Sequence, residues 1–321
     1  MSQLIVVALR QMLPQPGFFR RMRVYCQVMF PLPSRLVNAT LLYISFAVMV
    51  CRINGWPINL VSGWAALGVG NLFLLAFILR LMDELKDRDI DRQLFADRPV
   101  PSGLVLESDI RLTLAVTTLL YIAVNLASMS TFWFALICLI YTYLMMVYFF
   151  APTALRGNLL LNLATHNPSA PLMLALVVAL LASQHVVPLG SINLPDTTLA
   201  IAMFWSLVLS WELSRKIRSR EEENDYVTYS RIFGRVPATM IVLGVQAVAL
   251  MTGIALGVKH QLSFAFYVIL IAAYLVPLWA AIRFIVQPSA VTSKLRPFAE
   301  TYAALVFVSI IVEQLWRWMR G

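Results

Sequence analysis

The sequence is poor in charged residues and in cysteine. Only 13% of its 321 residues are Asp, Glu, Lys or Arg, whereas soluble domains have about 25%, so a soluble globular protein is excluded. The three cysteines, Cys26, Cys51 and Cys138, lie far apart in or near apolar runs. We therefore expect neither a disulfide framework nor a cysteine metal site, and the cysteines should pack as small apolar side chains.

Most of the chain is apolar. Hydrophobic residues make up 60% of it, in repeated runs of about 20 residues, each long enough to cross a bilayer. The alternating pattern of a transmembrane β-barrel is not seen. We predict an all-α fold, a polytopic membrane helical bundle that forms a single domain over residues 1–321. Hydropathy predicts nine spans, at residues 36–52, 59–82, 110–129, 131–150, 158–182, 197–214, 236–257, 263–285 and 298–317.

The N-terminal residues 1–34 precede the first predicted span and show no cleavable signal peptide. A mixture of basic and aromatic side chains predicts that this segment lies in the membrane interface. We interpret it as an anchor, with a lid over a substrate site as the alternative. The side chains that carry this prediction are Phe18, Phe19, Arg20, Arg21 and Arg23.

The basic residues give the orientation. Of the 25 Lys and Arg residues, 21 fall on the side of the N-terminus and four on the other side. The positive-inside rule places the N-terminus in the cytoplasm and the C-terminus outside. The net charge of +9 is then an orientation signal and implies no nucleic-acid partner. We expect an integral protein of a bacterial inner (plasma) membrane, surrounded by membrane lipids.

The acidic residues are concentrated in two places. Of 16 Asp and Glu residues, eight lie between Asp83 and Asp109 and five between Glu212 and Asp225. Both clusters follow a predicted span on the cytoplasmic side. Acidic residues contribute little to orientation, so topology does not explain the two clusters.

The first cluster has the spacing of a helix face. Taken as a continuation of the second span, Asp83, Asp87 and Asp91 are four residues apart, and Glu84 fits the same face. Mg²⁺ prefers oxygen ligands and keeps positions for substrate phosphates. The cluster therefore predicts a site for Mg²⁺ and a diphosphate, with a solvated loop of mixed charge as the alternative.

The second cluster combines acidic and basic residues. Glu212 and Lys216 are helix neighbours and could form a simple salt bridge, while Glu221 to Asp225 read as a loop. Positive charge for phosphate oxygens comes from Arg215, Lys216, Arg218 and Arg220. We expect the two clusters to converge over a central cavity that is open to the cytoplasmic side and to the bilayer.

Polar residues also occur inside spans, where they often mark a site. His166 could act as a base for an acceptor or contact a diphosphate, beside Asn167. The alternative is an interhelical hydrogen bond near a kink at Pro168. Asn71 in the second span is a weaker candidate of the same kind.

The first cluster resembles the first Asp-rich motif of the UbiA family of intramembrane prenyltransferases, Asn-Asp-x-x-Asp-x-x-x-Asp. Asp83 stands in place of the Asn and Glu84 in place of the first Asp. The downstream run Arg98-Pro99-Val100-Pro101-Ser102-Gly103 is similar to the family's Arg-Pro-x-x-Ser-Gly. Leu155-Arg156 and Thr165 to Ser169 are similar to stretches before and in its fifth helix.

The second motif departs from the family pattern. The stretch from Thr228 to Gly234 is similar to the one that closes the family's second motif. Alignment on the helix gives Glu212 and Lys216 as the motif positions, whereas counting back from Thr228 gives Glu221 and Asp225. A Lys in this motif also occurs in family members that make ether lipids. The sequence leaves the two alignments open.

The resemblance implies Mg²⁺-dependent transfer of a prenyl group from an allylic (poly)prenyl diphosphate to a small acceptor, aromatic or a lipid precursor. The alternatives are a UbiA-type terpene cyclase without a separate acceptor and a transporter. The implied metal ligands are Asp83, Glu84, Asp87, Asp91, Glu212, Glu221 and Asp225. The implied catalytic residues are Asp87, Asp91, Lys216 and His166. The implied substrate-binding residues are Lys86, Arg98, Arg156, Arg215, Asn167 and Asn71.

Aromatic rings near the cytoplasmic ends could shelter an allylic cation. The donor chain length, the acceptor and the oligomeric state are left open by the sequence. The aromatic candidates are Tyr148, Phe149, Phe150, Trp205, Trp211 and Tyr302.

Overall fold

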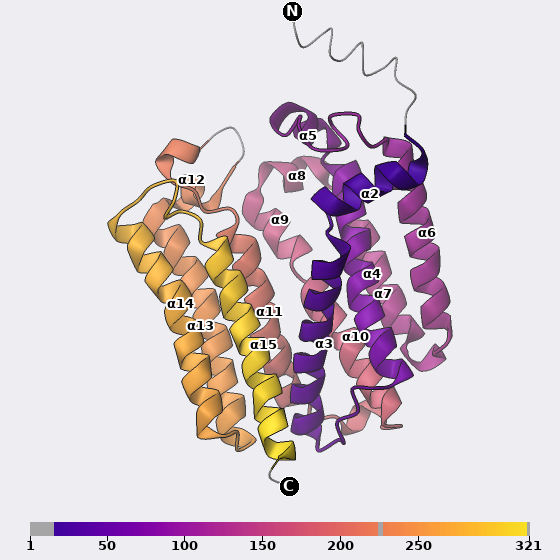
Figure 1. Ribbon diagram of the computed structural model, residues 1–321, viewed down its shortest axis with the longest axis vertical. Coiled ribbons are helices and arrows are strands. Elements are labelled where there is room, and N and C mark those ends of the chain that lie inside the picture. The colour runs from indigo at the N-terminus through magenta and orange to yellow at the C-terminus, as the bar shows by residue number, and fades with distance from the viewer. Residues whose placement is uncertain (1–15, 224–226, 320–321) are drawn as a thin grey trace, which may run out of the picture. The chain divides into compact units, whose positions relative to one another are not determined.

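The computed structural model describes residues 16–223 and 227–319, and within them it contains helices and no strand (Figure 1). In this described part, nine helical segments are long and apolar enough to cross a membrane, which confirms the nine-span prediction. They are α3 (Leu32–Asn54), α4 (Gly63–Lys86), α6 (Glu107–Leu126), α7 (Met129–Met146), α9 with α10 (Leu159–His166 and Ser169–Gln184), α11 (Leu194–Ser214), α13 (Arg235–Lys259), α14 (Phe264–Val286) and α15 (Arg296–Trp318).

Shorter helices connect these spans. The fifth span is interrupted at Asn167 and Pro168, because proline cannot donate the backbone hydrogen bond that a continuous helix requires. Side-chain caps begin several helices: Asn158 accepts a hydrogen bond from the Leu161 amide at 3.0 Å at the start of α9. The short elements are α2 (Phe18–Val28), α5 (Arg88–Leu94), η1 (Tyr148–Phe150), α8 (Pro152–Gly157), η2 (Leu189–Ser191), η3 (Arg220–Glu222) and α12 (Tyr229–Phe233).

The chain divides into two compact units. The first comprises Met1–Leu36 and Phe73–Tyr121, and the second comprises Val37–Leu72 and Ile122–Gly321. The single domain expected from the sequence stays a prediction.

In the first unit, the predicted interfacial segment contains the helix α2. The Arg21 guanidinium donates to both carboxylate oxygens of Asp109, at 2.6 and 2.7 Å, and this ion pair raises the pKa of Arg21. The side chain of Phe19, by contrast, is 85% exposed. One side of α2 is therefore fixed to the unit while an aromatic ring remains available for a membrane surface, as an interfacial helix requires.

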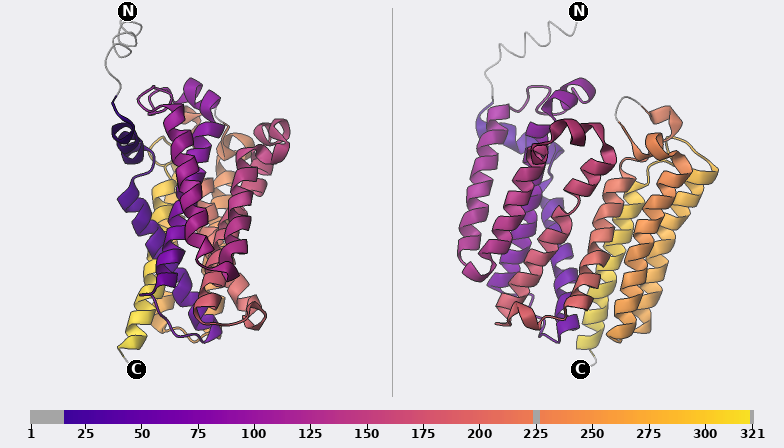
Figure 2. Two further views of the ribbon diagram at one scale, coloured as in Figure 1. Left: turned by 90° about the vertical axis from the view of Figure 1, so that its right-hand side faces the viewer. Right: turned by 180° about the vertical axis from the view of Figure 1, so that it is seen from behind.

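In the second unit, α11, α13, α14 and α15 lie side by side, and Figure 2 shows the same helices from behind. Aromatic rings fill the core: Phe204 on α11 contacts Phe46 on α3 and Phe307 on α15, with centroids 5.1 and 5.5 Å apart. Helix α10 packs against α7 and α11. Close van der Waals packing, rather than burial from water, holds such helices together in a bilayer.

A pair of asparagines joins α4 and α6 within the second unit. The amide groups of Asn71 and Asn125 donate to each other's side-chain oxygens at 3.1 and 2.7 Å, and both residues are fully buried. This exchange satisfies amide groups that would be costly to leave unpaired in an apolar interior. We therefore assign Asn71 to an interhelical hydrogen bond and do not retain it as a substrate-binding residue.

Gly68 on α4 is required for close packing against Tyr43 on α3. A Cβ atom at this position would lie 2.1 Å from the Tyr43 ring, which is itself buried. We expect Gly68→Ala to lower the free energy of unfolding by about 1–3 kcal/mol, because the rigid ring cannot move without disturbing the core.

The control for this prediction lies on the same helix. A Cβ atom at Gly70 has no neighbour within 4 Å, so Gly70→Ala should be neutral or slightly stabilising. Thermal unfolding of both variants in the same detergent measures the difference. Equal unfolding temperatures for the two variants would contradict the packing role of Gly68.

Candidate active site

The first carboxylate cluster lies in the first unit, where α4 ends. The expectation of one continuous helix is wrong, because α4 stops at Lys86 and α5 begins at Arg88. Asp87 is the N-cap of α5, with φ −99° and ψ 11°. Backbone hydrogen bonds of the helical type nevertheless continue across the bend. The Asp87 amide donates to the Asp83 carbonyl at 2.9 Å, and the Asp91 amide donates to the Asp87 carbonyl at 2.8 Å.

The carboxylates of this cluster differ in their surroundings. Asp83 is exposed and Asp87 is half-buried, while Glu84 and Asp91 are only 2% and 6% exposed. Glu84 forms an ion pair with Arg80 one turn earlier. Burial of an unpaired carboxylate would be unfavourable, so an arginine partner accounts for the depth at which Glu84 sits.

Arg98 is the partner of Asp91. One guanidinium nitrogen lies 2.8 Å from each carboxylate oxygen of Asp91, and the group stacks over the Phe95 ring at 3.9 Å. The structure thus places Arg98 beside the predicted metal ligands. It ties α5 to the following turn and also brings positive charge to the cluster.

The Arg-Pro-x-x-Ser-Gly run folds as a compact turn. The Ser102 amide bonds to the Arg98 carbonyl at 2.9 Å, and the Val105 amide bonds to the Pro99 carbonyl at the same distance. Gly103 has φ +76°, a left-handed conformation that favours glycine. The run therefore has a structural reason for its spacing, which is to present Arg98 to Asp91.

The second cluster lies in the second unit, on the last turn of α11 and in the loop that follows. Glu212 accepts hydrogen bonds from Arg215 at 2.6 and 3.0 Å, and its carboxylate lies 3.4 Å from the Lys216 ammonium. The Lys216 ammonium also stands 5.9 Å above the Tyr229 ring. Glu212 is thus placed between two cations, as the simple salt-bridge interpretation predicted.

Glu222 holds the loop after α11 together. Its carboxylate accepts hydrogen bonds from the Ser219 hydroxyl at 3.0 Å, from the Ser219 amide at 3.2 Å and from the Ser293 hydroxyl at 2.5 Å. Burial raises the pKa of Glu222, but these hydrogen bonds, with the positive charge of Arg218, outweigh it and hold the pKa below its usual value.

Because the pKa of Glu222 is lowered, its ionised form stabilises the folded loop. That contribution is fully present above pH 4.5, the ordinary pKa, and is lost as pH falls through the lowered value. We expect Glu222→Gln to flatten the dependence of the unfolding temperature on acidic pH. Glu221→Gln, at the exposed neighbouring position, is the control, and identical pH profiles for the two variants would contradict this role.

Glu223 has a similar structural role. It accepts hydrogen bonds from the Thr228 hydroxyl and the Ser230 hydroxyl, each at 2.7 Å. Of the predicted metal ligands in this cluster, Glu221 is the exposed one, and Asp225 lies outside the described residues. Glu221 is therefore the predicted ligand of this loop that lines a solvent-accessible space, in a wall that it shares with Glu223.

That space is a cleft of about 500 Å³ in the second unit, with four arginines in its wall. Arg235 at the start of α13 has a buried Nε atom without a hydrogen-bond partner among the described residues. Such a site suits an anion with several oxygen atoms. The lining residues are Arg218, Ser219, Arg220, Glu221, Glu223, Ser230, Arg231, Arg235 and Pro288.

Arg231 and Arg235 were not among the site residues predicted from the sequence. The available signal was their position on either side of Gly234, directly after the second cluster. The positive-inside rule used them only as orientation signals, because a count of basic residues does not show which of them share a cleft.

An aromatic corner follows α7. Tyr148, Phe149 and Phe150 all have left-handed backbone angles, with φ of 52°, 50° and 60°. These angles are strained for aromatic residues, and such strain is concentrated at functional sites. No sequence pattern revealed this corner.

Predicted site residues gather around this corner. The Arg156 guanidinium lies 4.8 Å from the Tyr148 ring centroid, and the His166 ring lies 6.2 Å from Tyr148 and 6.0 Å from Phe149. The Nδ1 atom of His166 is 2.9 Å from the Asn162 carbonyl. Since a carbonyl only accepts, Nδ1 carries the proton, and in the neutral ring Nε2 has the lone pair.

The other aromatic candidates are engaged in packing. Trp205 donates from its indole to Asn167, and Trp211 donates to Glu300 at 2.9 Å while Arg215 and Arg296 lie over its ring. These two arginines would repel a further cation beside Trp211. Tyr302 is fully buried and donates to the Gln246 carbonyl at 3.1 Å.

The donor set of the first cluster suits a hard cation. It consists of carboxylate oxygens without Cys or His, which is the chemistry that Mg²⁺ prefers. Among the described residues, no group of three His, Cys, Asp or Glu side chains is already gathered as a metal site. Two of the carboxylates, Glu84 and Asp91, are each paired with an arginine in this structure.

Comparison with known proteins gives structural matches alone. No protein-family profile matches the sequence, and no curated protein matches it. A UbiA homolog from Aeropyrum pernix K1 is 17% identical, with a TM-score of 0.61 over 87% of this chain and 97% of that one. A digeranylgeranylglyceryl phosphate synthase is 13% identical, with a TM-score of 0.59 over 91% of this chain and 98% of that one. The chain has the fold of these two proteins.

Proposed function

We propose that this protein is an intramembrane prenyltransferase of the UbiA type. It would move a prenyl group from an allylic (poly)prenyl diphosphate to a small acceptor and release diphosphate. The observation that carries the proposal is the carboxylate cluster of residues 83–91 with its Arg98 turn, at the end of the second span of a chain with this fold. The proposed setting is a bacterial inner membrane, with the carboxylate clusters on the cytoplasmic side.

The residues of the bend between α4 and α5 fit a metal-binding role. Asp83, Asp87 and Asp91 would hold Mg²⁺, which when bound offsets the charge that develops on the departing diphosphate. Arg98, held against Asp91 at 2.8 Å, keeps that carboxylate in place and adds positive charge. Lys86, the last residue of α4, is proposed as a further phosphate contact.

The basic cleft of the second unit fits the diphosphate itself. Arg218, Arg220 and Arg235 line one space of about 500 Å³, and guanidinium groups match phosphate oxygens closely. Glu221 in the same wall remains the proposed metal ligand of this loop. Lys216, beside Glu212, is proposed to keep that carboxylate neutralised.

The aromatic corner fits the cationic half of the reaction. Departure of the diphosphate breaks the allylic C–O bond and leaves a cation, which the face of Phe149 could stabilise. The Tyr148 ring already has the Arg156 guanidinium over it. His166 would then take the proton that the acceptor loses, at Nε2, because Nδ1 is held by the Asn162 carbonyl. The bond formed is between the prenyl carbon and the acceptor nucleophile.

The direct test is turnover by the purified protein in detergent or nanodiscs. Allylic diphosphates of increasing length, Mg²⁺ and a panel of acceptors are supplied, and diphosphate release and products are measured. The panel includes phenolic acids and prenylated glyceryl phosphates, because one structural match is a digeranylgeranylglyceryl phosphate synthase. Absence of Mg²⁺-dependent diphosphate release with every donor would contradict the proposal.

The product distinguishes the second candidate, a UbiA-type terpene cyclase. The cyclase remains a candidate because the second cluster departs from the family motif, and its Glu212 is already paired with Arg215 and Lys216. Diphosphate release without an acceptor, together with a cyclic hydrocarbon or alcohol, would identify the cyclase. Release that requires an acceptor, together with a prenylated product, would identify the transferase.

A further inference from the structure

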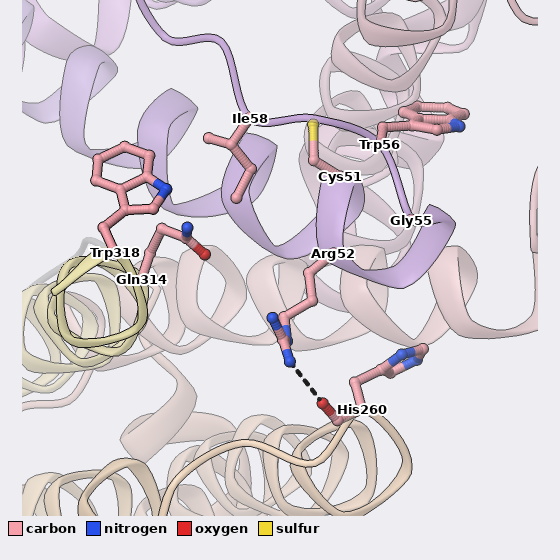
Figure 3. Close-up of a pocket in the computed structure, with 8 residues that line it drawn as sticks. All are labelled: Cys51, Arg52, Gly55, Trp56, Ile58, His260, Gln314 and Trp318. Atoms are coloured by element: carbon pink, nitrogen blue, oxygen red, sulfur yellow. Dashed lines mark hydrogen bonds between the residues drawn. The ribbon is translucent and has the colours of Figure 1, made fainter. Parts of the chain in front are cut away.

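A second cavity lies in the second unit, at the opposite end of α13 from the basic cleft. It measures about 450 Å³ and is drawn in Figure 3. Its wall comes from the last turns of α3 and α15 and from the residue that follows α13, through Arg52, Gln314, Trp318 and His260. These are the ends of three predicted membrane spans, where hydrocarbon gives way to lipid headgroups.

Arg52 points into this cavity, between His260 on one side and Gln314 with Trp318 on the other (Figure 3). One terminal nitrogen donates to the His260 carbonyl at 3.1 Å. Its Nε atom is buried and has no hydrogen-bond partner in the described part of the chain. The guanidinium thus has a buried donor that no described residue accepts from.

The nearby carboxylates form ion pairs with other basic side chains. Asp196 is paired with the Lys259 ammonium at 2.7 Å and lies 3.0 Å from the His260 ring. Glu313 is paired with Arg317 at 2.6 Å. Among the described residues Arg52 forms no ion pair, although the Glu313 carboxylate attracts it through space. The described charged groups at this end are three basic side chains, Arg52, Lys259 and Arg317, and two carboxylates, Asp196 and Glu313.

The other side chains suit a headgroup that reaches in from the bilayer. Trp56 and Trp318 lie at span ends, and tryptophan is enriched where membrane meets water. Trp318 is 56% exposed, whereas Gln314 is 8% exposed and lines the inner wall. An indole at the rim and an amide with a guanidinium inside provide donors for phosphate oxygens next to an apolar surface.

We propose that this cavity binds the phosphate of a membrane phospholipid, with Arg52 as the group that recognises it. The proposal is independent of the catalytic one, because the residues involved belong to neither carboxylate cluster nor to the basic cleft. A lipid bound here would bridge α3, the turn after α13 and α15, and would stabilise the second unit.

Native mass spectrometry and thermal unfolding of the full-length protein test this. Delipidated protein receives phosphatidylglycerol or, separately, soluble glycerol phosphate. We expect the lipid to be retained and to raise the unfolding temperature, whereas glycerol phosphate should do neither at the same concentration. If glycerol phosphate binds as well as the lipid, the cavity is a site for a free phosphate ester, and the proposal is overturned.

Arg52→Gln should weaken retention of the lipid by about tenfold or more, because it removes a charge-assisted contact. Arg283→Gln is the matched control, since Arg283 is exposed and stacks on Trp279 near the other end of α14. If Arg52→Gln does not fold, Trp318→Leu at the rim should still weaken retention. Wild-type lipid retention in the folded variants, even with a lower unfolding temperature, would show that Arg52 is purely structural and overturn the proposal.

Discussion

Asp91→Asn is expected to lower the rate of diphosphate release by at least about 100-fold, because it removes a charge that would hold the metal at the departing group. The carboxylate is buried and fixed by Arg98 at 2.8 Å, so its position does not need to be organised during the reaction. We also expect the Mg²⁺ concentration for half-maximal activity to rise. Steady-state release of diphosphate across a Mg²⁺ titration measures both effects.

Two further variants separate this role from a structural one. Asp89→Asn, on the same short helix, is the matched control, because its side chain is 72% exposed and forms only a loose pair with Arg88 at 3.4 Å. It should change activity by less than about twofold. Arg98→Gln removes the structural partner of Asp91. If Asp91→Asn and Arg98→Gln lose activity and stability equally, and the double variant loses no more, Asp91 serves only to hold the turn.

Arg235→Gln is expected to raise the KM for the prenyl diphosphate by about tenfold, with a smaller effect on kcat. The reason is the buried Nε atom in the wall of the basic cleft, which makes no hydrogen bond within the described residues and would donate to a diphosphate oxygen. Inorganic diphosphate should inhibit the variant more weakly by a similar factor, which links the effect to the phosphate groups.

Arg283→Gln again provides a matched loss of one arginine, since it lies at the surface of α14 and outside the cleft. Its KM for the donor and its inhibition by diphosphate should remain those of the wild type. If the KM of Arg235→Gln equals that of Arg283→Gln, the cleft does not bind the donor. Lys86 and Arg98 would then be the remaining proposed phosphate contacts.

The sequence predicts the helices well because the signal for a membrane span is local. A run of about 20 apolar residues must form a helix to satisfy its backbone inside a bilayer. The predicted spans agree with the structure to within a few residues at most ends. The second span is one exception: charged residues after Met82 lower its hydropathy, yet its helix continues to Lys86.

The candidate site is predicted less completely, because its contacts are not local. Residue spacing indicates that Asp83, Asp87 and Asp91 belong together, but it does not reveal the bend at Asp87 or the Arg98 partner of Asp91. A single sequence also gives no measure of backbone strain, so the left-handed corner at Tyr148–Phe150 was not expected.

The sequence by itself determined the all-α class, the number of spans and the concentration of 13 of 16 carboxylates in two clusters. The length of an apolar run and the position of a charged residue are local features of the sequence, so they can be determined without coordinates. The tertiary structure alone decided which polar and charged groups are paired. It pairs Asn71 with Asn125, Glu84 with Arg80 and Asp196 with Lys259, and among the described residues it leaves the buried Nε atoms of Arg52 and Arg235 without a hydrogen-bond partner. Such pairing depends on which helices meet, and that is set by packing across the whole chain.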